Sequence, residues 1–227
     1  MKKLLAVLLV LLAVTGCTPG NKNSEDALKF KEDYESLNGL SDGYGGTYRV
    51  IEINEDNPFV YVTIEDVVAM MNSGKSFIVY FGSNWCPWCR SVLPFFVETC
   101  KKLKVDTVYY VDVRVGNDMD KDIRDAYSLN ENNEVYLSHE GPEAYHQFIK
   151  MASDVLDDYS RSDVETLDGT PFEGAKRVGA PNFVMIKDGK AVKMSLCVPE
   201  SLDDPSMELT DKIINDIGKS CEEFLNE

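Results

Sequence analysis

A pair of cysteines directly after an apolar segment constrains the fold of this chain more than any other feature. Cys86 and Cys89 follow residues 76–81, whose nearly continuous apolar character predicts a buried central strand. After Cys86, apolar residues such as Leu93 and Phe96 recur at helical spacing. The sequence therefore predicts a strand that leads into a helix, with both thiols at the start of that helix.

This position of the two cysteines predicts redox chemistry. Free backbone N–H groups and the positive end of the dipole at a helix start favour the thiolate, which is the form that attacks disulfides. We expect Cys86 to attack and Cys89, one turn into the helix and more buried, to resolve the mixed disulfide. Trp85 offers a flat apolar surface for docking, although packing would also explain a tryptophan here.

Two alternatives would also place two cysteines at this spacing. One is half of a structural zinc site, but no second Cys-x-x-Cys or Cys/His pair stands at a suitable distance along the chain. The other is a static disulfide, which has no particular need of a helix start. We therefore favour the redox interpretation and predict no metal site.

Strand-like and helix-like segments follow one another along the chain, which predicts an α/β domain. The predicted strands are 47–53, 60–62, 76–81, 107–113, 182–187 and 191–198. The predicted helices are 64–71 (capped by Thr63), the segment from Cys86 to about 100, 118–127, 142–159 and 209–224. A strand, a helix and a strand in succession predict a parallel pair with a right-handed crossover. Residues 116–176 depart from this order, and we predict a helical insertion there.

The segment Phe81-Gly82-Ser83-Asn84-Trp85-Cys86-Pro87-Trp88-Cys89 resembles the active site of the thioredoxin superfamily. Pro94 matches the proline that bends the active-site helix of that family. Val178-Gly179-Ala180-Pro181 and the later turn Asp188-Gly189-Lys190 are similar to its cis-proline loop and final hairpin. The resemblance covers about residues 60–227. It implies a thioredoxin-like fold, which is a central mixed β-sheet flanked by helices, with the helical insertion before the cis-proline strand.

The same resemblance implies the residues that meet a substrate. The Ala180–Pro181 bond is expected to be cis and to face Cys86, where its backbone pairs with a bound substrate strand. The implied substrate-binding residues are Trp85, Pro87, Trp88, Ala180 and Pro181.

The chain also departs from the family pattern. A buried aspartate often lies five residues before the tryptophan, where it assists proton transfer at the resolving cysteine, and here that position is Tyr80. The lysine that pairs with this aspartate is missing as well. Pro87 and Trp88 between the cysteines match neither thioredoxins nor the oxidising members, and no histidine is present to stabilise the thiolate. The direction of electron flow therefore stays open.

The first residues have the pattern of a bacterial lipoprotein. Lys2 and Lys3 precede an apolar run at 4–14 that is too short to span a bilayer, so we expect a signal peptide at 1–16. Val14-Thr15-Gly16-Cys17 resembles a lipobox, in which cleavage precedes Cys17 and the thiol carries lipid. An ordinary secretory signal is the alternative. We expect 17–46 to be a tether or stalk, 47–227 to be the folded domain, and the protein to be extracytoplasmic and lipid-anchored to the cell membrane.

The formal net charge of −16 limits the partners. An acidic surface repels nucleic acid and anionic lipid, so we expect no nucleic-acid binding, and membrane contact through the anchor alone. Together with the lipobox and the insertion, this charge makes the chain similar to thioredoxin-like lipoproteins of Gram-positive bacteria, including the bacteriocin-transport accessory type.

Apart from the pair and Cys17, three cysteines remain, and the chain has two histidines. Cys100 is expected to be a small buried hydrophobe, about 16 Å along the helix from Cys89. Cys197 and Cys221 could form a disulfide, but strand alternation predicts that Cys197 points away from the apolar face formed by Val192, Met194 and Leu196. His139 and His146 are expected to be solvent-facing or locally bonded.

The sequence thus predicts a membrane-anchored, extracytoplasmic thiol–disulfide oxidoreductase of thioredoxin-like fold. It would act on protein thiols and disulfides together with a redox partner, and it would need no cofactor. The alternative is a binding protein of the same fold. That protein would be either a secretion accessory factor whose thiols are vestigial or a copper carrier that uses both thiolates.

Overall fold

The computed structural model describes residues 22–43, 45–132, 134–158 and 176–226. The predicted signal peptide and Cys17 lie outside these residues. The central sheet has the strand order β1-β3-β2-β6-β7. Its parallel part is β1 (Phe59–Tyr61), β3 (Val108–Asp112) and β2 (Phe77–Gly82). β6 (Asn182–Lys187) and β7 (Lys190–Ser195) extend it antiparallel, so the sheet is mixed.

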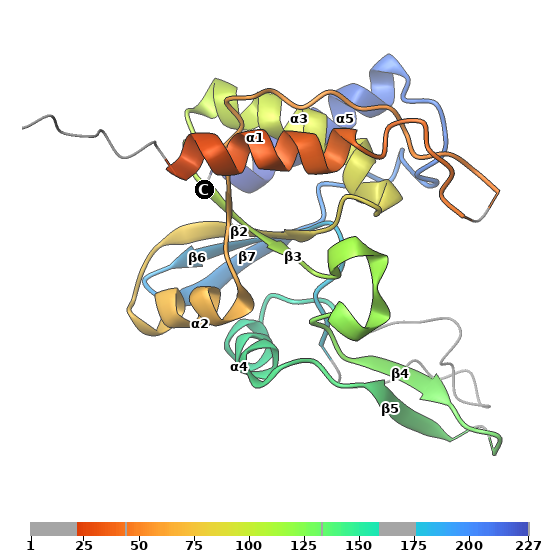
Figure 1. Ribbon diagram of the computed structural model, residues 1–227. Helices are drawn as coiled ribbons and strands as arrows, with labels where there is room; N and C mark the ends of the chain where they lie inside the picture. The colour runs from red at the N-terminus through yellow and green to blue at the C-terminus, as the bar shows by residue number, and fades with distance from the viewer. Residues whose placement is uncertain (1–21, 44, 133, 159–175, 227) are drawn as a thin grey trace, which may run out of the picture.

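Helices cover both faces of this sheet (Figure 1). α1 (Lys22–Glu35), α3 (Pro87–Leu103) and α5 (Asp211–Leu225) lie on one face, and α2 (Ile64–Asn72) and α4 (Glu143–Ala152) lie on the other. Each face has its own core because successive side chains of β2 point to opposite sides. Tyr80 packs with α1 and α3, whereas Val79 and Phe81 pack with α2 and α4. This arrangement is the predicted thioredoxin-like fold.

The strands and helices around the two cysteines were predicted correctly. β2 leads into α3, and α3 returns the chain to β3, which pairs parallel with β2. Thr63 caps α2 with a full capping box, in which its side chain and that of Asp66 each bind the other's backbone N–H. Pro94 lies inside α3, as the resemblance implied.

The predicted tether is wrong for residues 22–35, because they form α1, which belongs to the folded domain. Ala27, Phe30 and Tyr34 recur at helical spacing and are buried. The ring of Phe30 stacks on that of Phe59 in β1, with centroids 4.1 Å apart. The helix thus covers the edge of the sheet at β1. Because α1 is packed there, the segment that follows it starts from a fixed position.

Residues 47–53 were predicted to form a strand, but they run beside the helices without joining the sheet. Side chains of the preceding segment satisfy the backbone of Ile51 and Ile53. The N–H of Ile51 donates to Asn38 Oδ1 at 3.0 Å, and the N–H of Ile53 donates to Glu35 Oε1 at 2.8 Å. A strand needs a neighbouring strand for these bonds, whereas here polar side chains supply them.

The insertion before the cis-proline is less helical than predicted. The helix predicted at 118–127 is replaced by the short 3₁₀ turns η1 (Val115–Asn117) and η2 (Met119–Lys121) and by the start of a hairpin. This hairpin, β4 (Ala126–Leu129) and β5 (Val135–His139), projects from the body of the protein (Figure 1). The helix predicted at 142–159 is α4, which ends at Ala152. Residues 159–175 of the predicted insertion lie outside the described part of the chain.

The predicted orientation of Cys197 is also wrong. β7 ends at Ser195, and Cys197 has a left-handed backbone conformation with φ of 53°. This turn directs its side chain into the core, where it is 1% exposed, while Leu196 is 38% exposed. Cys197 and Cys221 are both buried and free in the structure, and the interaction with the Cys197 thiol raises the pKa of Cys221.

Candidate active site

Cys86 is the N-cap residue of α3, at the end of β2. The backbone N–H of Cys89 donates a hydrogen bond to Cys86 Sγ at 3.3 Å. The Cys86 thiol itself donates to the carbonyl oxygen of Ala180 at 3.1 Å. Pro87 takes the first helical position, where a backbone N–H would have no partner within the helix, so its absence costs no hydrogen bond. The fold thus brings the predicted residues Cys86, Cys89 and Ala180 together from two distant parts of the chain.

The surroundings of the two thiols act on their ionisation in opposite directions. Burial disfavours the Cys86 thiolate, but hydrogen bonds from the Cys89 side chain and from the amides of Cys89 and Trp88 outweigh it. The pKa of Cys86 is therefore lowered from its ordinary value. Burial, followed by the hydrogen bond and the charge of Cys86, raises the pKa of Cys89 well above its ordinary value. This asymmetry suits Cys86 to attack and Cys89 to react second.

The Ala180–Pro181 bond is cis, as the resemblance implied. Pro181 is buried, while Ala180 and Trp88 are half-buried and Pro87 is exposed. The surface around Cys86 therefore combines an exposed proline ring, a partly exposed indole and a backbone carbonyl. An extended peptide segment can meet each of these groups.

Trp85 is held in place by the chain that follows β3. Its indole Nε1 donates to the carbonyl oxygen of Arg114 at 2.8 Å, and the Arg114 guanidinium lies 4.7 Å from the ring centroid. Trp85 and Pro87 line a cavity of about 580 Å³, together with Tyr48, Arg49, Arg114 and Pro205, among others. The half-buried indole thus packs on one side and faces a hollow beside Cys86 on the other.

A buried ion cluster joins the segment after β3 to the insertion. Asp122 Oδ2 accepts hydrogen bonds from Arg114 Nε at 2.8 Å and from Arg124 Nη2 at 2.9 Å. Two guanidinium groups share one carboxylate, so the cluster keeps a net positive charge, and the charge of Arg124 contributes to lowering the pKa of Cys86. Sequence reasoning missed Arg124, because a single arginine in a polar segment carries no local signal of burial.

Sequence reasoning also missed Arg90, the residue after Cys89, because nothing local marks a charged residue as buried. Its side chain is fully buried and donates five hydrogen bonds. The acceptors are the carbonyl oxygens of Tyr34, Arg49 and Asn84 and the side chain of Asn38. Arg90 therefore ties the segment after α1 to the first turn of α3.

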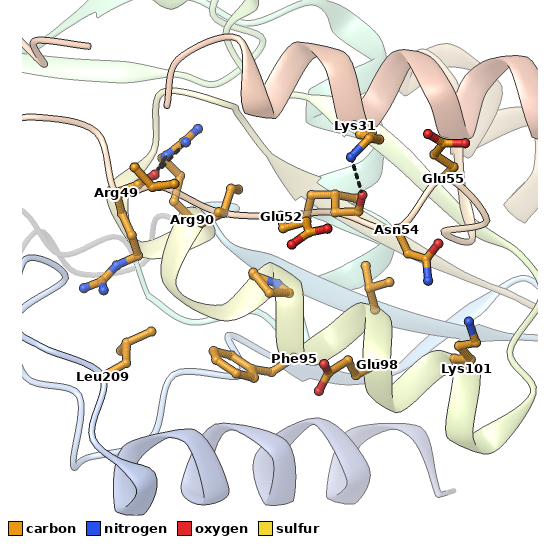
Figure 2. A pocket seen from close by; sticks show the side chains of 15 residues that line it. Lys31, Arg49, Glu52, Asn54, Glu55, Arg90, Phe95, Glu98, Lys101 and Leu209 are labelled. Atoms are coloured by element: carbon orange, nitrogen blue, oxygen red, sulfur yellow. Dashed lines mark hydrogen bonds between the residues drawn. The ribbon is translucent and has the colours of Figure 1, made fainter. Parts of the chain in front are cut away.

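A second hollow, of about 670 Å³, lies between α1, the segment 49–55 and α3 (Figure 2). Its labelled side chains include acidic and basic groups from three segments, such as Lys31, Glu52 and Glu98, and it contains no cysteine. Arg90 binds the Arg49 carbonyl at its edge. Because it does not reach either thiol, this hollow is separate from the candidate site.

The two histidines are bonded within the insertion, as predicted. His139 Nε2 lies 2.6 Å from the carbonyl oxygen of Asp122, and His146 Nε2 lies 2.9 Å from Asp125 Oδ1. The hydrogen bond to the Asp125 carboxylate raises the pKa of His146. In the part of the chain that the structure describes, no three His, Cys, Asp or Glu side chains are grouped as metal ligands.

The comparisons with known proteins agree with this geometry at a coarse level. No protein-family model matches the chain. A segment of 66 residues is 32% identical to a protein described as "Probable nucleoredoxin 1" from Arabidopsis thaliana. The match covers 29% of this chain and 11% of that relative. The chain thus combines weak, local similarity to a nucleoredoxin with a thioredoxin-like fold.

None of the described helices is long and apolar enough to cross a bilayer. The chemistry that the described residues support is that of a dithiol with one activated sulfur. Cys86 can form a covalent bond with a sulfur atom that approaches past Ala180 and Trp85. Cys89, one helical turn away, can then displace it.

Proposed function

We propose that this protein is a thiol–disulfide oxidoreductase that acts on protein thiols and disulfides through Cys86 and Cys89. The observation that carries the proposal is the position of Cys86 Sγ, which caps α3 and accepts the amide hydrogen of Cys89. A negative sulfur is stabilised at that point by hydrogen bonding and by the helix dipole. The local similarity to a nucleoredoxin supports the same class of activity.

Reduction of a substrate proceeds in two exchanges. The Cys86 thiolate attacks one sulfur of the substrate disulfide, the Cys86–substrate bond forms, and the other substrate sulfur leaves with the electron pair and takes a proton. Cys89 then attacks Cys86 Sγ, and the first substrate sulfur leaves in the same way. The substrate gains two electrons and two protons, and the protein holds a Cys86–Cys89 disulfide. Oxidation of a substrate dithiol is the reverse sequence.

The docking surface consists of Trp85, Pro87, Trp88, Ala180 and Pro181. A substrate segment that lies against Ala180 replaces the contact between the Cys86 thiol and the Ala180 carbonyl. The cavity beside Trp85 leaves room for a side chain of that segment.

Cys17 is proposed to carry a lipid after cleavage of residues 1–16, which would hold the protein on the outer side of the cell membrane. Expression in a bacterium with a radiolabelled fatty acid tests this part separately. Label should enter the wild-type protein and be absent from Cys17→Ser. Equal labelling of both proteins would exclude Cys17 as the lipid site.

Turnover of insulin with dithiothreitol and of scrambled ribonuclease tests the activity. Residues 22–227 should catalyse at least one of these reactions, and Cys86→Ser should lose that catalysis, whereas Cys100→Ser, which changes another buried thiol, should keep it. Equal rates for wild type and Cys86→Ser would contradict the proposal. The reduction potential of the pair then gives the direction, because a value near that of thioredoxin fits a reductant and a much higher one fits an oxidant.

The hairpin of the insertion favours a second function, that of an accessory protein that binds a partner. Tyr136 and Leu137 on β5 are 48% and 41% exposed. As successive residues of a strand, they expose one apolar side chain on each face of the hairpin, and a bound partner would cover them. A pull-down with wild type, with Tyr136→Ser/Leu137→Ser and with Cys86→Ser separates the two functions. A partner lost only in the hairpin variant would support the accessory function, and one lost only in Cys86→Ser would support the redox function.

A further inference from the structure

Two buried tyrosine hydroxyls lie behind the second cysteine. Tyr34 Oη in α1 and Tyr80 Oη in β2 are 3.0 Å apart, and both side chains are fully buried. The Tyr80 hydroxyl and the Cys89 thiol belong to the same buried cluster, and hydrogen bonding from the phenol favours the Cys89 thiolate. Tyr34, Tyr80 and Cys89 therefore form a continuous line of polar groups through an otherwise apolar core.

The packing leaves the Tyr80 side chain little freedom. Its ring stacks on those of Phe183 and Tyr110, with centroids 4.6 and 5.3 Å away. Gly82 lies on the same face of β2, two residues on. A Cβ at Gly82 would stand 2.0 Å from the Tyr80 hydroxyl oxygen, so the phenol occupies the space that a side chain at 82 would fill. The absence of a side chain at Gly82 thus permits the contact with Cys89.

Cys89 has no exposed surface, so a thiolate there must be stabilised by protein groups instead of water. The titratable and charged groups that act on it are Tyr34, Tyr80, Cys86 and Arg90. Hydrogen bonding from the Tyr80 side chain and from the Ser83 backbone favours the Cys89 thiolate. The contributions of Cys86 that oppose it disappear once Cys86 is held in a mixed disulfide. The Tyr80 hydroxyl is then the main side-chain donor to Cys89.

We propose that Tyr80 is a catalytic residue that stabilises the Cys89 thiolate by a hydrogen bond, and that Tyr34 is a positioning residue that orients and polarises the Tyr80 hydroxyl. This inference rests on the proposed redox function and assigns α1 a part in the second exchange. Both phenols stay protonated, because burial raises the pKa of each well above its ordinary value. They therefore act as hydrogen-bond donors and not as bases.

Cys89 gives up its proton, and its thiolate accepts the hydrogen bond from Tyr80 while Tyr34 donates to Tyr80 Oη. The thiolate attacks Cys86 Sγ, the Cys86–Cys89 bond forms, and the Cys86–substrate bond breaks. The electron pair leaves on the substrate sulfur, which takes up the proton that Cys89 gave up.

The reagent 5,5′-dithiobis(2-nitrobenzoate) resolves this step without a protein substrate. Attack by Cys86 releases one coloured thiolate, and displacement by Cys89 releases the second, so the rate of the second phase against pH reports the ionisation of Cys89. In Tyr80→Phe we expect the second phase to slow about tenfold at pH 7, with its midpoint at a higher pH, because a hydrogen bond to a charged group is lost. Tyr34→Phe should slow it about threefold in the same direction. The first phase should change little in either variant.

Tyr61→Phe is the matched control, because it removes a hydroxyl from the same aromatic cluster that binds Asp33 and not Cys89. Its second phase should match that of the wild type. An unchanged second phase in both Tyr80→Phe and Tyr34→Phe would overturn the inference, as would equal slowing in Tyr61→Phe. If Tyr80→Phe does not fold, Tyr34→Phe decides alone. No second phase in the wild type would instead contradict the proposed function itself.

Discussion

Arg124 donates two hydrogen bonds to Asp122, from Nε to Oδ1 and from Nη2 to Oδ2, each at 2.9 Å. Both side chains are almost fully buried, and Arg114 binds the same carboxylate from the loop that holds Trp85. This pair therefore connects the insertion to the candidate active site. The buried Arg124 guanidinium is not solvated by water, so its stability depends on the Asp122 carboxylate.

Loss of the Asp122 carboxylate should destabilise the protein strongly. Asp122→Asn leaves Arg124 buried without a counter-charge, and we expect a loss of about 3–5 kcal/mol in the free energy of unfolding. Urea denaturation at pH 7 measures it. Asp56→Asn, which removes an exposed partner of Lys101, is the control and should cost less than about 1 kcal/mol. Similar losses in the two variants would contradict this account of the cluster.

The same carboxylate predicts a dependence of stability on pH. Burial opposes ionisation of Asp122, but the hydrogen bonds and charges of Arg124 and Arg114 lower its pKa to about 2. A folded-state pKa below the unfolded value stabilises the protein above pH 4, and this stabilisation is lost as the pH falls towards 2. It amounts to about 2 kcal/mol. Denaturation series at several pH values should show this loss in wild type and a flatter curve in Asp122→Asn.

Thiol reactivity should be confined to Cys86 in folded, reduced protein that comprises residues 22–227, at pH 7. The Cys86 pKa is lowered, whereas burial raises the pKa of Cys100 to about 12, and the hydrogen bond with Cys197 raises that of Cys221. Alkylation with iodoacetamide followed by peptide mapping should find one modified site. Arg124→Gln should slow it about twofold by removing a positive charge, and Lys101→Gln on the far part of α3 should not. Modification of several cysteines at equal rates would contradict the expectation.

Arg90 should be essential for attaching the segment after α1. Lysine offers three donors on one nitrogen and cannot reproduce five bonds from a planar fork, so Arg90→Lys should cost about 2–4 kcal/mol. Chemical denaturation measures the loss, and limited proteolysis should show new cleavage between residues 36 and 50. Lys102→Arg, an exposed change on the same helix, serves as the control. Proteolysis that stays unchanged in Arg90→Lys would show that other contacts hold the segment.

Gly82→Ala should disturb the core through Tyr80. The added Cβ would overlap the Tyr80 phenol, so we expect a loss of about 1–3 kcal/mol. In a Tyr80→Leu background the same substitution should cost much less, because the overlapping ring is absent. A double-mutant cycle measures this coupling. Additive costs would mean that the two residues do not compete for the same space.

The sequence predicted those parts of the fold whose signals are local. The apolar run of β2, the cap at Thr63 and the turn at residues 188–190 each mark an element without knowledge of its neighbours. The resemblance around Cys86 and Pro181 then supplied the arrangement of the sheet and the cis bond. Because the resemblance supplied this arrangement, the site residues predicted from it come together around Cys86.

The errors concern residues whose state depends on distant partners. α1 has only a narrow apolar stripe, and Leu28 within it is 43% exposed, so its burial against β1 left a weak pattern. The left-handed turn at Cys197 reverses an orientation that strand alternation predicts. Arg90 and Arg124 are buried charges, which the general rule places at the surface. Each is buried because acceptors from other segments surround it.

The central claim is that Cys86 forms the covalent bond with a protein substrate, and trapping tests it most directly. Cys89→Ala should accumulate a disulfide-linked complex with insulin or scrambled ribonuclease, because no thiol remains to displace the substrate. A non-reducing gel and peptide mapping should assign the link to Cys86, and Cys86→Ser/Cys89→Ala should form no complex. A complex of equal yield in that double variant, or one linked through another cysteine, would contradict the account.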